Sequence, residues 1–486
     1  MSLRDKAISG ATWSLAGRLL QQAFQFVIGI ILARLLIPEQ YGLVAMATVF
    51  IFISFVFIDS GFSTALIQRK KCTQADYSTI FYVNLIISII VFFIFYFSAS
   101  FISKFYNEPR LTNIVRALSF LIILFALTVV QKAIIAREVN FKLRTQIEFS
   151  SQVVSGIIAV FLAIKGYGVW ALVWKTLLNQ FFVTLQLWIR NRWFPSFEFN
   201  KKSLKEMFGF SSRLLISGIL DRVYQQIYKL IIGKFFPARE LGLFTRADQF
   251  QRLPSQTISG AITSFTLPIF SKMQNEPERL SRALKKIISL VMFFNINAMV
   301  LMAIVAKPMI ASLLGSKWID TTEYLQLLCF VGILYPIHLI NVQVLASMGR
   351  SDLFLKIEIV KKLFSIPAIL LAIFVSIKAM IIGMIVASLA SVYINTYYTN
   401  KLIGVSLMDQ IAEILPSFIV AGIMATITVG IGLIVQQYLN SYVLMIVQIV
   451  GGVLIVTTIS HLLKIKAYNE LKLIFKEKFI KNNEKK

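Results

Sequence analysis

Long apolar segments, separated by short polar breaks, run along almost the whole chain. A helix needs about 20 apolar residues to cross a hydrocarbon core of roughly 30 Å. Fourteen segments reach about that length, near residues 10–36, 42–67, 79–102, 111–136, 146–164, 168–189, 208–236, 241–270, 286–314, 323–348, 353–376, 379–400, 411–436 and 441–463. The pattern predicts an all-α polytopic membrane protein with 14 transmembrane helices.

Composition supports this prediction. Hydrophobic residues make up 57% of the 486 residues and charged residues only 15%, whereas roughly 25% of the residues in soluble domains are charged. The stretches between the apolar segments are short. A folded soluble domain is therefore not expected.

Two adjacent segments, within residues 209–270, carry charges where lipid would not tolerate them. A charge at the bilayer centre costs roughly 2.5–3.5 kcal/mol on insertion scales, so such residues usually face protein or a water-filled cavity. At 100° per residue, five polar residues of the first helix fall within about 140° and five of the second within about 60°. These are Asp221, Arg222, Gln225, Gln226 and Lys229, followed by Thr245, Gln249, Arg252, Gln256 and Thr263. We predict two neighbouring helices that help to line a hydrated, cationic cavity.

The first apolar segment has a similar polar stripe, about 100° wide, formed by Ser14, Arg18, Gln21, Gln22, Gln25 and Gly29. The substrate-binding residues predicted from these stripes and the charges beside them are Arg18, Arg213, Arg222, Lys229, Arg246, Arg252, Gln21, Gln25, Gln225 and Gln249. Three acids lie in the apolar segments as well: Asp59, Asp221 and Asp248. They could bind a coupling ion or neutralise nearby arginines, and both interpretations stay open.

The net charge of +26 is explained by topology better than by a nucleic-acid partner. Lysines and arginines in short loops mark the cytoplasmic side. With 14 helices, 29 lysines and arginines fall on the side of the termini and 8 on the other side. Both termini are therefore predicted to be cytoplasmic, and the basic tail at residues 465–486 could contact anionic lipid headgroups.

Cysteine and histidine offer little chemistry. Cys72 and Cys329 are too few for a disulfide framework or a cysteine-type zinc site, and His338 and His461 lie far apart in the sequence. His338, two residues after Pro336, fits helix packing better than a proton relay. We predict no metal site and no cofactor, although transport could be coupled to H⁺ or Na⁺.

An internal repeat is indicated by a shift of 200 residues. It places residues 33–36 over 233–236 and residues 41–43 over 241–243 without a gap; chance similarity between apolar segments is the alternative explanation. A true repeat would give two parallel six-helix lobes related by a pseudo-two-fold axis along the membrane normal. The predicted domains are an N-lobe at 1–200, a C-lobe at 201–402, two further helices at 403–464 and the tail at 465–486.

The first 70 residues resemble a known family. Residues 10–13 read GATW, residues 32–47 read LARLLIPEQYGLVAMA and residues 59–69 read DSGFSTALIQR. These motifs resemble Wzx-type polysaccharide exporters, specifically the colanic and teichuronic acid branch of the multidrug/oligosaccharidyl-lipid/polysaccharide (MOP) flippase superfamily. The resemblance implies a MATE-like fold with a central cavity bordered by the first, second, seventh and eighth helices.

The resemblance also implies a function. Such exporters move undecaprenyl-pyrophosphate-linked oligosaccharides from the cytoplasmic to the outer leaflet of the bacterial cytoplasmic membrane by alternating access, for cell-surface polysaccharide synthesis. The residues are compatible, because the forked donors of arginine suit a diphosphate. Membrane lipids and a polysaccharide polymerase machinery are the expected partners.

Other functions remain open from the sequence. A lipid II flippase of the same superfamily also carries a diphosphate, whereas a multidrug transporter for cations would favour an acidic or aromatic cavity. A membrane-embedded polysaccharide polymerase or ligase needs sugar-handling residues on an outer loop, and the predicted outer loops are short. An anion channel would also use a basic interior. We predict a transporter, not an enzyme, with no catalytic residues.

Overall fold

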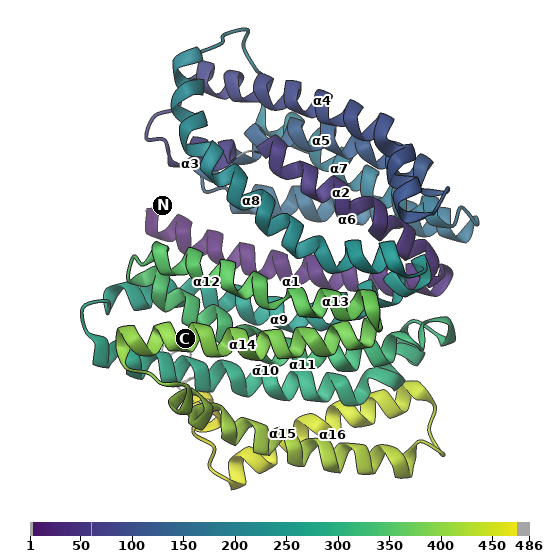
Figure 1. Cartoon of the computed structure of the whole chain (residues 1–486), viewed down its shortest axis with the longest axis vertical. Coiled ribbons are helices and arrows are strands. Elements are labelled where there is room, and N and C mark those ends of the chain that lie inside the picture. The colour runs from purple at the N-terminus through teal and green to yellow at the C-terminus, as the bar shows by residue number, and fades with distance from the viewer. Residues whose placement is uncertain (1–2, 60, 474–486) are drawn as a thin grey trace, which may run out of the picture. The chain divides into compact units, whose positions relative to one another are not determined.

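The computed structural model describes residues 3–59 and 61–473, and regular structure within these ranges is helical throughout (Figure 1). Some side chains inside the helices lie outside this description, namely those of residues 3–16, 18, 210–214, 216, 217, 256–261, 263–265, 351 and 355. The chain divides into two compact units, one ending at Gly242 and the other beginning at Leu243.

Eight helices belong to the first unit. They are α1 (Leu3–Leu35), α2 (Pro38–Asp59), α3 (Phe62–Gln68), α4 (Gln74–Tyr106), α5 (Leu111–Arg137), α6 (Phe141–Ile164), α7 (Val169–Asn191) and α8 (Lys201–Phe235). Within this unit α1 packs on α6, α2 packs on α5 and α8, and α5 packs on α4 and α7.

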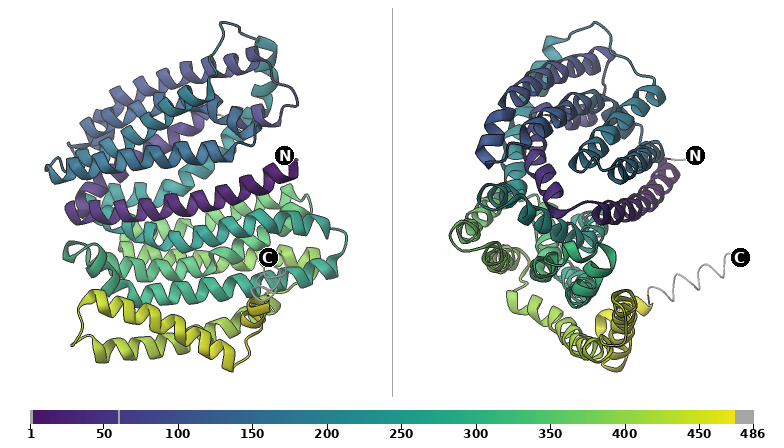
Figure 2. Two further views of the ribbon diagram at one scale, coloured as in Figure 1. Left: turned by 180° about the vertical axis from the view of Figure 1, so that it is seen from behind. Right: turned by 90° about the vertical axis from the view of Figure 1, so that its right-hand side faces the viewer.

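The second unit contains nearly all of α9 and the helices that follow it. These are α9 (Ala238–Lys272), α10 (Pro277–Leu313), the short 3₁₀ helix η1 (Ser316–Trp318), α11 (Thr321–Ser347), α12 (Ser351–Phe364), α13 (Ile366–Phe374), α14 (Ile377–Ile403), α15 (Leu407–Val435) and α16 (Ser441–Leu462). Both α15 and α16 pack against α10 and against each other, and α11 packs on α14 (Figure 2).

Nine candidate membrane spans are found among the described residues by length and apolar composition. They are 38–68, 74–106, 111–137, 141–164, 277–313, 321–347, 377–403, 407–435 and 441–462. A shorter apolar stretch, Leu19–Leu35, lies within α1. The chain is a multi-pass membrane protein, while the exact number of 14 crossings stays a prediction. Neither α8 nor α9 is among these spans, because α8 carries several charges and α9 carries charges in its first half and Ser, Thr, Gln and Pro in its second.

Two predicted helices are broken. The segment predicted at 42–67 divides into α2 and α3 around Gly61, whose φ of 77° lies in the left-handed region that glycine adopts without a steric penalty. The segment predicted at 353–376 divides into α12 and α13 at Ser365, before Pro367 in the first turn of α13. Proline has no N–H to continue the helical hydrogen bonds. Both breaks carry a local signal, Asp59 and Ser60 before Gly61 and Pro367 after Ser365, which the length of the apolar segments does not reveal.

The segment between α7 and α8 is held to the first unit by hydrogen bonds. Gln74 donates to the carbonyl oxygen of Phe194 at 2.6 Å, and the indole N–H of Trp193 donates to Gln74 at 2.8 Å. The hydroxyl oxygen of Ser78 accepts from the backbone N–H of Ser196 at 2.8 Å. The predicted lobe boundary at residues 200 and 201 follows this anchored segment, and the lobes themselves stay a prediction.

Helix boundaries coincide with the predicted 200-residue repeat. The break between Leu35 and Pro38 separates α1 from α2, and the break between Phe235 and Ala238 separates α8 from α9. Equivalent backbone hydrogen bonds end the two preceding helices: the N–H of residue 36 donates to the carbonyl of residue 32, and that of residue 236 to residue 232, each at 2.9 Å.

The first turns of α2 and α9 meet at two glycines in equivalent positions. A Cβ atom on Gly42 would lie 1.7 Å from the carbonyl oxygen of Ala238, and one on Gly242 would lie 1.9 Å from that of Pro38. Both distances are far inside van der Waals contact, and the obstacle each time is backbone. We call this contact the glycine crossing; only residues without a side chain fit there.

Charged side chains join several helix ends of the first unit. Arg110, just before α5, donates to Glu39 of α2 at 2.5 Å and to Glu108 at 2.7 Å. Hydrogen bonds from Arg110 lower the pKa of the Glu108 carboxyl below its ordinary value. Lys234, near the end of α8, donates to the carbonyl oxygen of Phe105 in α4 at 2.5 Å. The ends of α2, α4, α5 and α8 are thus tied together by polar contacts.

Candidate functional site

Most of the predicted polar residues of α8 are exposed. Asp221, Arg222 and Gln225 are exposed within this 35-residue helix, and Lys229 is half-buried. A terminal nitrogen of Arg222 donates to the amide oxygen of Gln225 at 3.3 Å. About one turn of helix thereby presents a guanidinium, a carboxylate and an amide. Arg213, also predicted, has a side chain outside the described residues.

Arg252 and Asp248 form an ion pair one turn apart on α9. Nε of Arg252 donates to Oδ1 of Asp248 at 2.7 Å. The arginine side chain is 53% exposed and the aspartate side chain only 12% exposed. The buried carboxylate therefore orients a guanidinium that stays open to a ligand. For Asp248 the sequence predicts either that it binds a coupling ion or that it neutralises an arginine. The structure contains the contact with an arginine.

Arg246 lies on the same helix but is buried. It donates to the amide oxygen of Gln249 at 2.7 Å, and its guanidinium carbon lies 5.8 Å from the ring centroid of Trp318. Trp318, in η1, is fully buried. Cation–π contacts of this kind stabilise a guanidinium that has left water. The geometry gives Arg246 a packing role, and its predicted contact with substrate stays a prediction.

A polar contact between α9, α10 and α11 does not follow from the polar stripes. Gln251 is buried and donates to Ser255 at 3.1 Å, and a Cβ on Gly332 of α11 would lie 2.0 Å from the Gln251 amide nitrogen. Asn295 of α10 donates to the carbonyl oxygens of Gly332 and Ile333, both at 2.9 Å.

Pro336 explains this cluster. It lacks the N–H that would bond the Gly332 carbonyl four residues earlier, and freed backbone groups in membrane helices are satisfied by neighbouring helices. The amide of Asn295 takes that place. A proline inside an apolar segment is therefore the sequence signal that could have located a buried polar partner.

The predicted residues of α1 divide between packing and exposure. Gln21 donates weakly to the backbone carbonyl of Thr145 in α6 at 3.4 Å, and its own carbonyl accepts from Gln152 at 3.3 Å. Gln25 is exposed. Arg18, the charged member of this stripe, has a side chain outside the described residues. The contacts of Gln21 are those of a residue that joins α1 to α6.

Asp59, the last residue of α2, bonds to the start of α3. Its Oδ1 accepts from the backbone N–H of Ser63 at 3.1 Å, in the first turn of α3. A carboxylate at a helix N-terminus is favoured by the free N–H groups and by the helix dipole. Lys132 of α5 is an electrostatic neighbour of Asp59, which the sequence did not indicate. An ion-coupling role for Asp59 stays a prediction.

The contacts thus group the predicted residues into separate sets. Arg222 joins Gln225 on α8, Arg252 joins Asp248 on α9, and Arg246 joins Gln249 beside them. That the stripes of α1, α8 and α9 face one common cavity stays a prediction. Among the described residues, no group of three or more His, Cys, Asp or Glu side chains could hold a metal ion.

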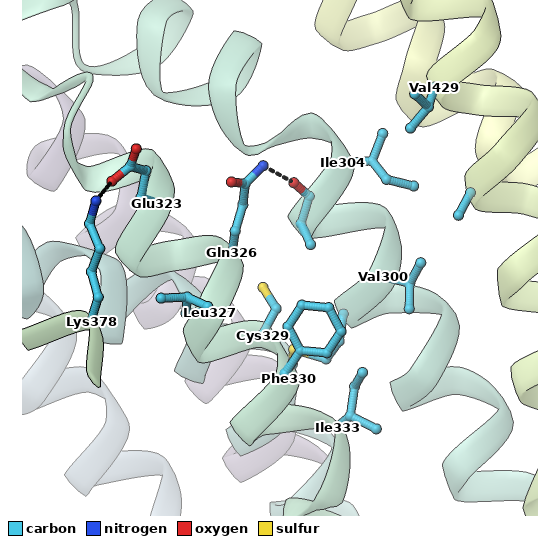
Figure 3. Close-up of a pocket in the computed structure, with 13 residues that line it drawn as sticks. Val300, Ile304, Glu323, Gln326, Leu327, Cys329, Phe330, Ile333, Lys378 and Val429 are labelled. Atoms are coloured by element: carbon cyan, nitrogen blue, oxygen red, sulfur yellow. Dashed lines mark hydrogen bonds and ion pairs between the residues drawn. The ribbon is translucent and has the colours of Figure 1, made fainter. Parts of the chain in front are cut away.

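A pocket of about 760 Å³ in the second unit has a different chemistry. Figure 3 shows its lining, which comes from α10, α11, α15 and the start of α14. Side chains such as Val300, Leu327 and Phe330 make it mostly apolar, and Lys378 forms an ion pair with Glu323 at one end. The described residues that line it include no arginine, so it is a poor candidate for a diphosphate site.

Comparisons with known proteins agree on one family. The sequence model described as "Polysaccharide biosynthesis protein" matches residues 31–323. The chain is 25% identical over 355 residues to the teichuronic acid biosynthesis protein TuaB of Bacillus subtilis (strain 168), covering 72% of this chain and 73% of TuaB. It is 26% identical over 381 residues to the lipopolysaccharide biosynthesis protein WzxC of Escherichia coli (strain K12), covering 76% of each.

The fold is shared with a solved membrane protein. The lipid II flippase MurJ in an inward closed conformation superposes with a TM-score of 0.74 at 14% identity, covering 96% of this chain and 99% of that one. At this identity the likeness establishes the fold alone. The predicted resemblance to Wzx-type exporters of the MOP superfamily is confirmed by the family model and the named relatives. The chain belongs to the polysaccharide biosynthesis protein family.

Proposed function

We propose that this protein is a flippase that moves an undecaprenyl-pyrophosphate-linked oligosaccharide from the cytoplasmic to the outer leaflet, for cell-surface polysaccharide synthesis. The observation that carries the proposal is the exposed guanidinium of Arg252, oriented by the buried carboxylate of Asp248 inside a membrane protein. An arginine fork binds phosphate oxygens in pairs. The named relatives act in teichuronic acid and lipopolysaccharide biosynthesis, whose products are glycans.

Arg222 and Gln225 on α8 are also proposed to bind substrate. A diphosphate carries more charge than one arginine neutralises, and sugar hydroxyls pair well with amide groups, which donate and accept. The exposed side chains of α8 offer both chemistries. Arg18, Arg213, Lys229, Arg246, Gln21, Gln25 and Gln249 complete the proposed substrate-binding set, and Asp59, Asp221 and Asp248 are the candidates for coupling H⁺ or Na⁺.

Transport by alternating access requires one end of the protein to open while the other closes. The glycine crossing supports this proposal because backbone meets backbone there with no side chain between. Such a contact can separate and form again without repacking side chains. We propose that the crossing lies on the outer side of the cytoplasmic membrane, with both termini in the cytoplasm, as the distribution of basic loops predicts.

The test replaces Arg252 in a strain that depends on this protein. Arg252→Ala should lower export of the lipid-linked repeat unit roughly 10- to 100-fold, the range that corresponds to about 1.5–3 kcal/mol for a hydrogen bond to a charged group. Arg252→Lys should restore part of it, since lysine keeps the charge but not the fork. The measurement is the amount of undecaprenyl-linked repeat unit that accumulates in the cytoplasmic leaflet.

Arg279→Ala is the matched control. Arg279 is exposed and pairs with Glu276 at 3.3 Å near the start of α10, so its loss should leave export unchanged. Full export by Arg252→Ala at normal abundance would refute the proposed role of Arg252. Accumulation of lipid II in place of an oligosaccharide intermediate would assign the substrate to peptidoglycan synthesis.

A further inference from the structure

The second unit also contains an apolar groove of about 550 Å³. Unlike the pocket in Figure 3, it has a lysine and no acidic residue among the described residues that line it. It lies between α10, α16 and the helical residues 466–473, the last that the structure describes, which we call the short helix. Most of its lining is apolar, with Phe294, Ala298 and Leu301 from α10 and Val453 and Val456 from α16. Its polar lining residues are Asn297 of α10, Thr457 of α16, and Tyr468 and Lys472 of the short helix, and Lys472 is the charged one.

The short helix is a fixed wall of this groove. Ala467 is 2% exposed, so one face of the helix is packed. Glu470 forms an ion pair with Lys286 of α10 at 3.5 Å, and the N–H of Ile465 donates to the carbonyl oxygen of Ser460 at 3.0 Å. The ion pair holds the helix against α10, the turn after α16 sets where the helix begins, and Lys472 lies at the groove.

The charges beside the groove favour an anion. Lys464, Lys466 and Lys472 lie on this segment and are exposed, while the one acid among residues 464–473, Glu470, is already paired with Lys286. Lysines of this kind reach along apolar surface and place their ammonium groups at the membrane interface. In the pocket of Figure 3, by contrast, Lys378 is paired with Glu323.

We propose that this groove binds an anionic glycerophospholipid, with one acyl chain between α10 and α16 and its phosphate at Lys472. An apolar groove in a multi-pass membrane protein is filled by hydrocarbon rather than water, because its walls offer water few hydrogen-bonding partners. Basic pockets beside membrane helices bind anionic headgroups. The groove supplies both requirements in one place, and this site is independent of the substrate proposed above.

The test uses purified, full-length protein stripped of lipid in detergent. Phosphatidylglycerol or phosphatidylcholine with identical chains is added, and bound lipid is counted by native mass spectrometry. Wild-type protein should prefer phosphatidylglycerol about fivefold, the factor equivalent to about 1 kcal/mol for one lysine near an anionic lipid. Lys472→Gln should abolish the preference, whereas Lys466→Gln, on the same helix but outside the lining of the groove, should keep it.

A second variant tests the acyl-chain part of the proposal. Ala298→Trp fills the groove and should reduce binding of both lipids. Equal preference for phosphatidylglycerol in wild type and Lys472→Gln would overturn the proposal, as would an equal loss of preference in Lys466→Gln, which would indicate a diffuse basic surface. The two lysine variants change exposed side chains, so their comparison holds even if Ala298→Trp does not fold.

Discussion

At the scale of single residues, Arg252 and Asp248 have different roles in the proposed phosphate site. The carboxylate is mostly buried and the guanidinium mostly exposed, so Asp248 is positioned to orient Arg252 and has little surface of its own for substrate. An ion pair whose cation stays open to solvent contributes little to stability. Its importance here lies in holding one arginine conformation for a phosphate.

Asp248→Asn should therefore lower export because Arg252 loses its anchor. If orientation is the only task of Asp248, the double variant Asp248→Asn with Arg252→Ala should export no worse than Arg252→Ala alone, with a coupling of about 0.5–3 kcal/mol. The measurement is the export rate of all four proteins. Additive losses would instead show that Asp248 acts independently, as a coupling ion site would. Glu276→Gln, beside Arg279, is the matched control.

How far the sequence predicts the site can be judged at the same residues. The stripe rule finds Arg252, Arg222 and Gln225, all exposed, because charges inside apolar segments need water or protein around them. Arg246 lies outside that stripe, yet the predicted set keeps it beside Arg252, because its burial depends on Trp318, far away in the sequence. Tertiary partners of this kind leave no local pattern.

At the scale of helices, the glycines of two contacts differ in what surrounds them. At the glycine crossing, an added Cβ meets a backbone carbonyl oxygen at 1.9 Å or less, which cannot move without shifting a helix. At Gly332, it would meet the end of the Gln251 side chain at 2.0 Å. That amide can rotate away. The two contacts look similar by distance but differ in what must give way.

Gly242→Ala should consequently be the more damaging change. Forcing extra volume into a packed contact costs about 1–3 kcal/mol, so the thermal midpoint of purified protein should fall clearly for Gly242→Ala and less for Gly332→Ala. Export should fall too, since the first turns of α2 and α9 could not close on each other. A Gly332→Ala protein that is the less stable of the two would contradict this interpretation of the contacts.

The long apolar helices are predicted well from hydropathy, and their breaks are not. The segments predicted at 111–136 and 441–463 correspond to the spans 111–137 and 441–462 and differ from them only in the last residue. The left-handed Gly61 and the break at Ser365 have local signals in the sequence, Asp59 and Ser60 before the glycine and Pro367 after the serine. A prediction by apolar length alone joins the two sides of each break. Backbone conformation, not polarity, decides these places.

At the scale of the whole molecule, the distribution of basic loops predicts on which side of the membrane each loop lies. Helices α14, α15 and α16 are joined by loops at 404–406 and 436–440, which must lie on opposite sides of the membrane if α15 crosses it once. Alkaline phosphatase folds only outside the cytoplasm. Fused after Leu439 it should be active, and fused after Gly404 it should be inactive. The reverse pattern would contradict cytoplasmic termini.

The glycine crossing has a consequence for how such a chain could arise. Its two contacts are reciprocal: Gly42 faces Ala238 as Gly242 faces Pro38, and the members of each equivalent pair are 200 residues apart. This is the arrangement found where one surface patch meets a second copy of itself in a two-fold dimer. If the predicted repeat reflects a gene duplication, the separate ancestral copies would have paired through this same glycine before their genes were fused.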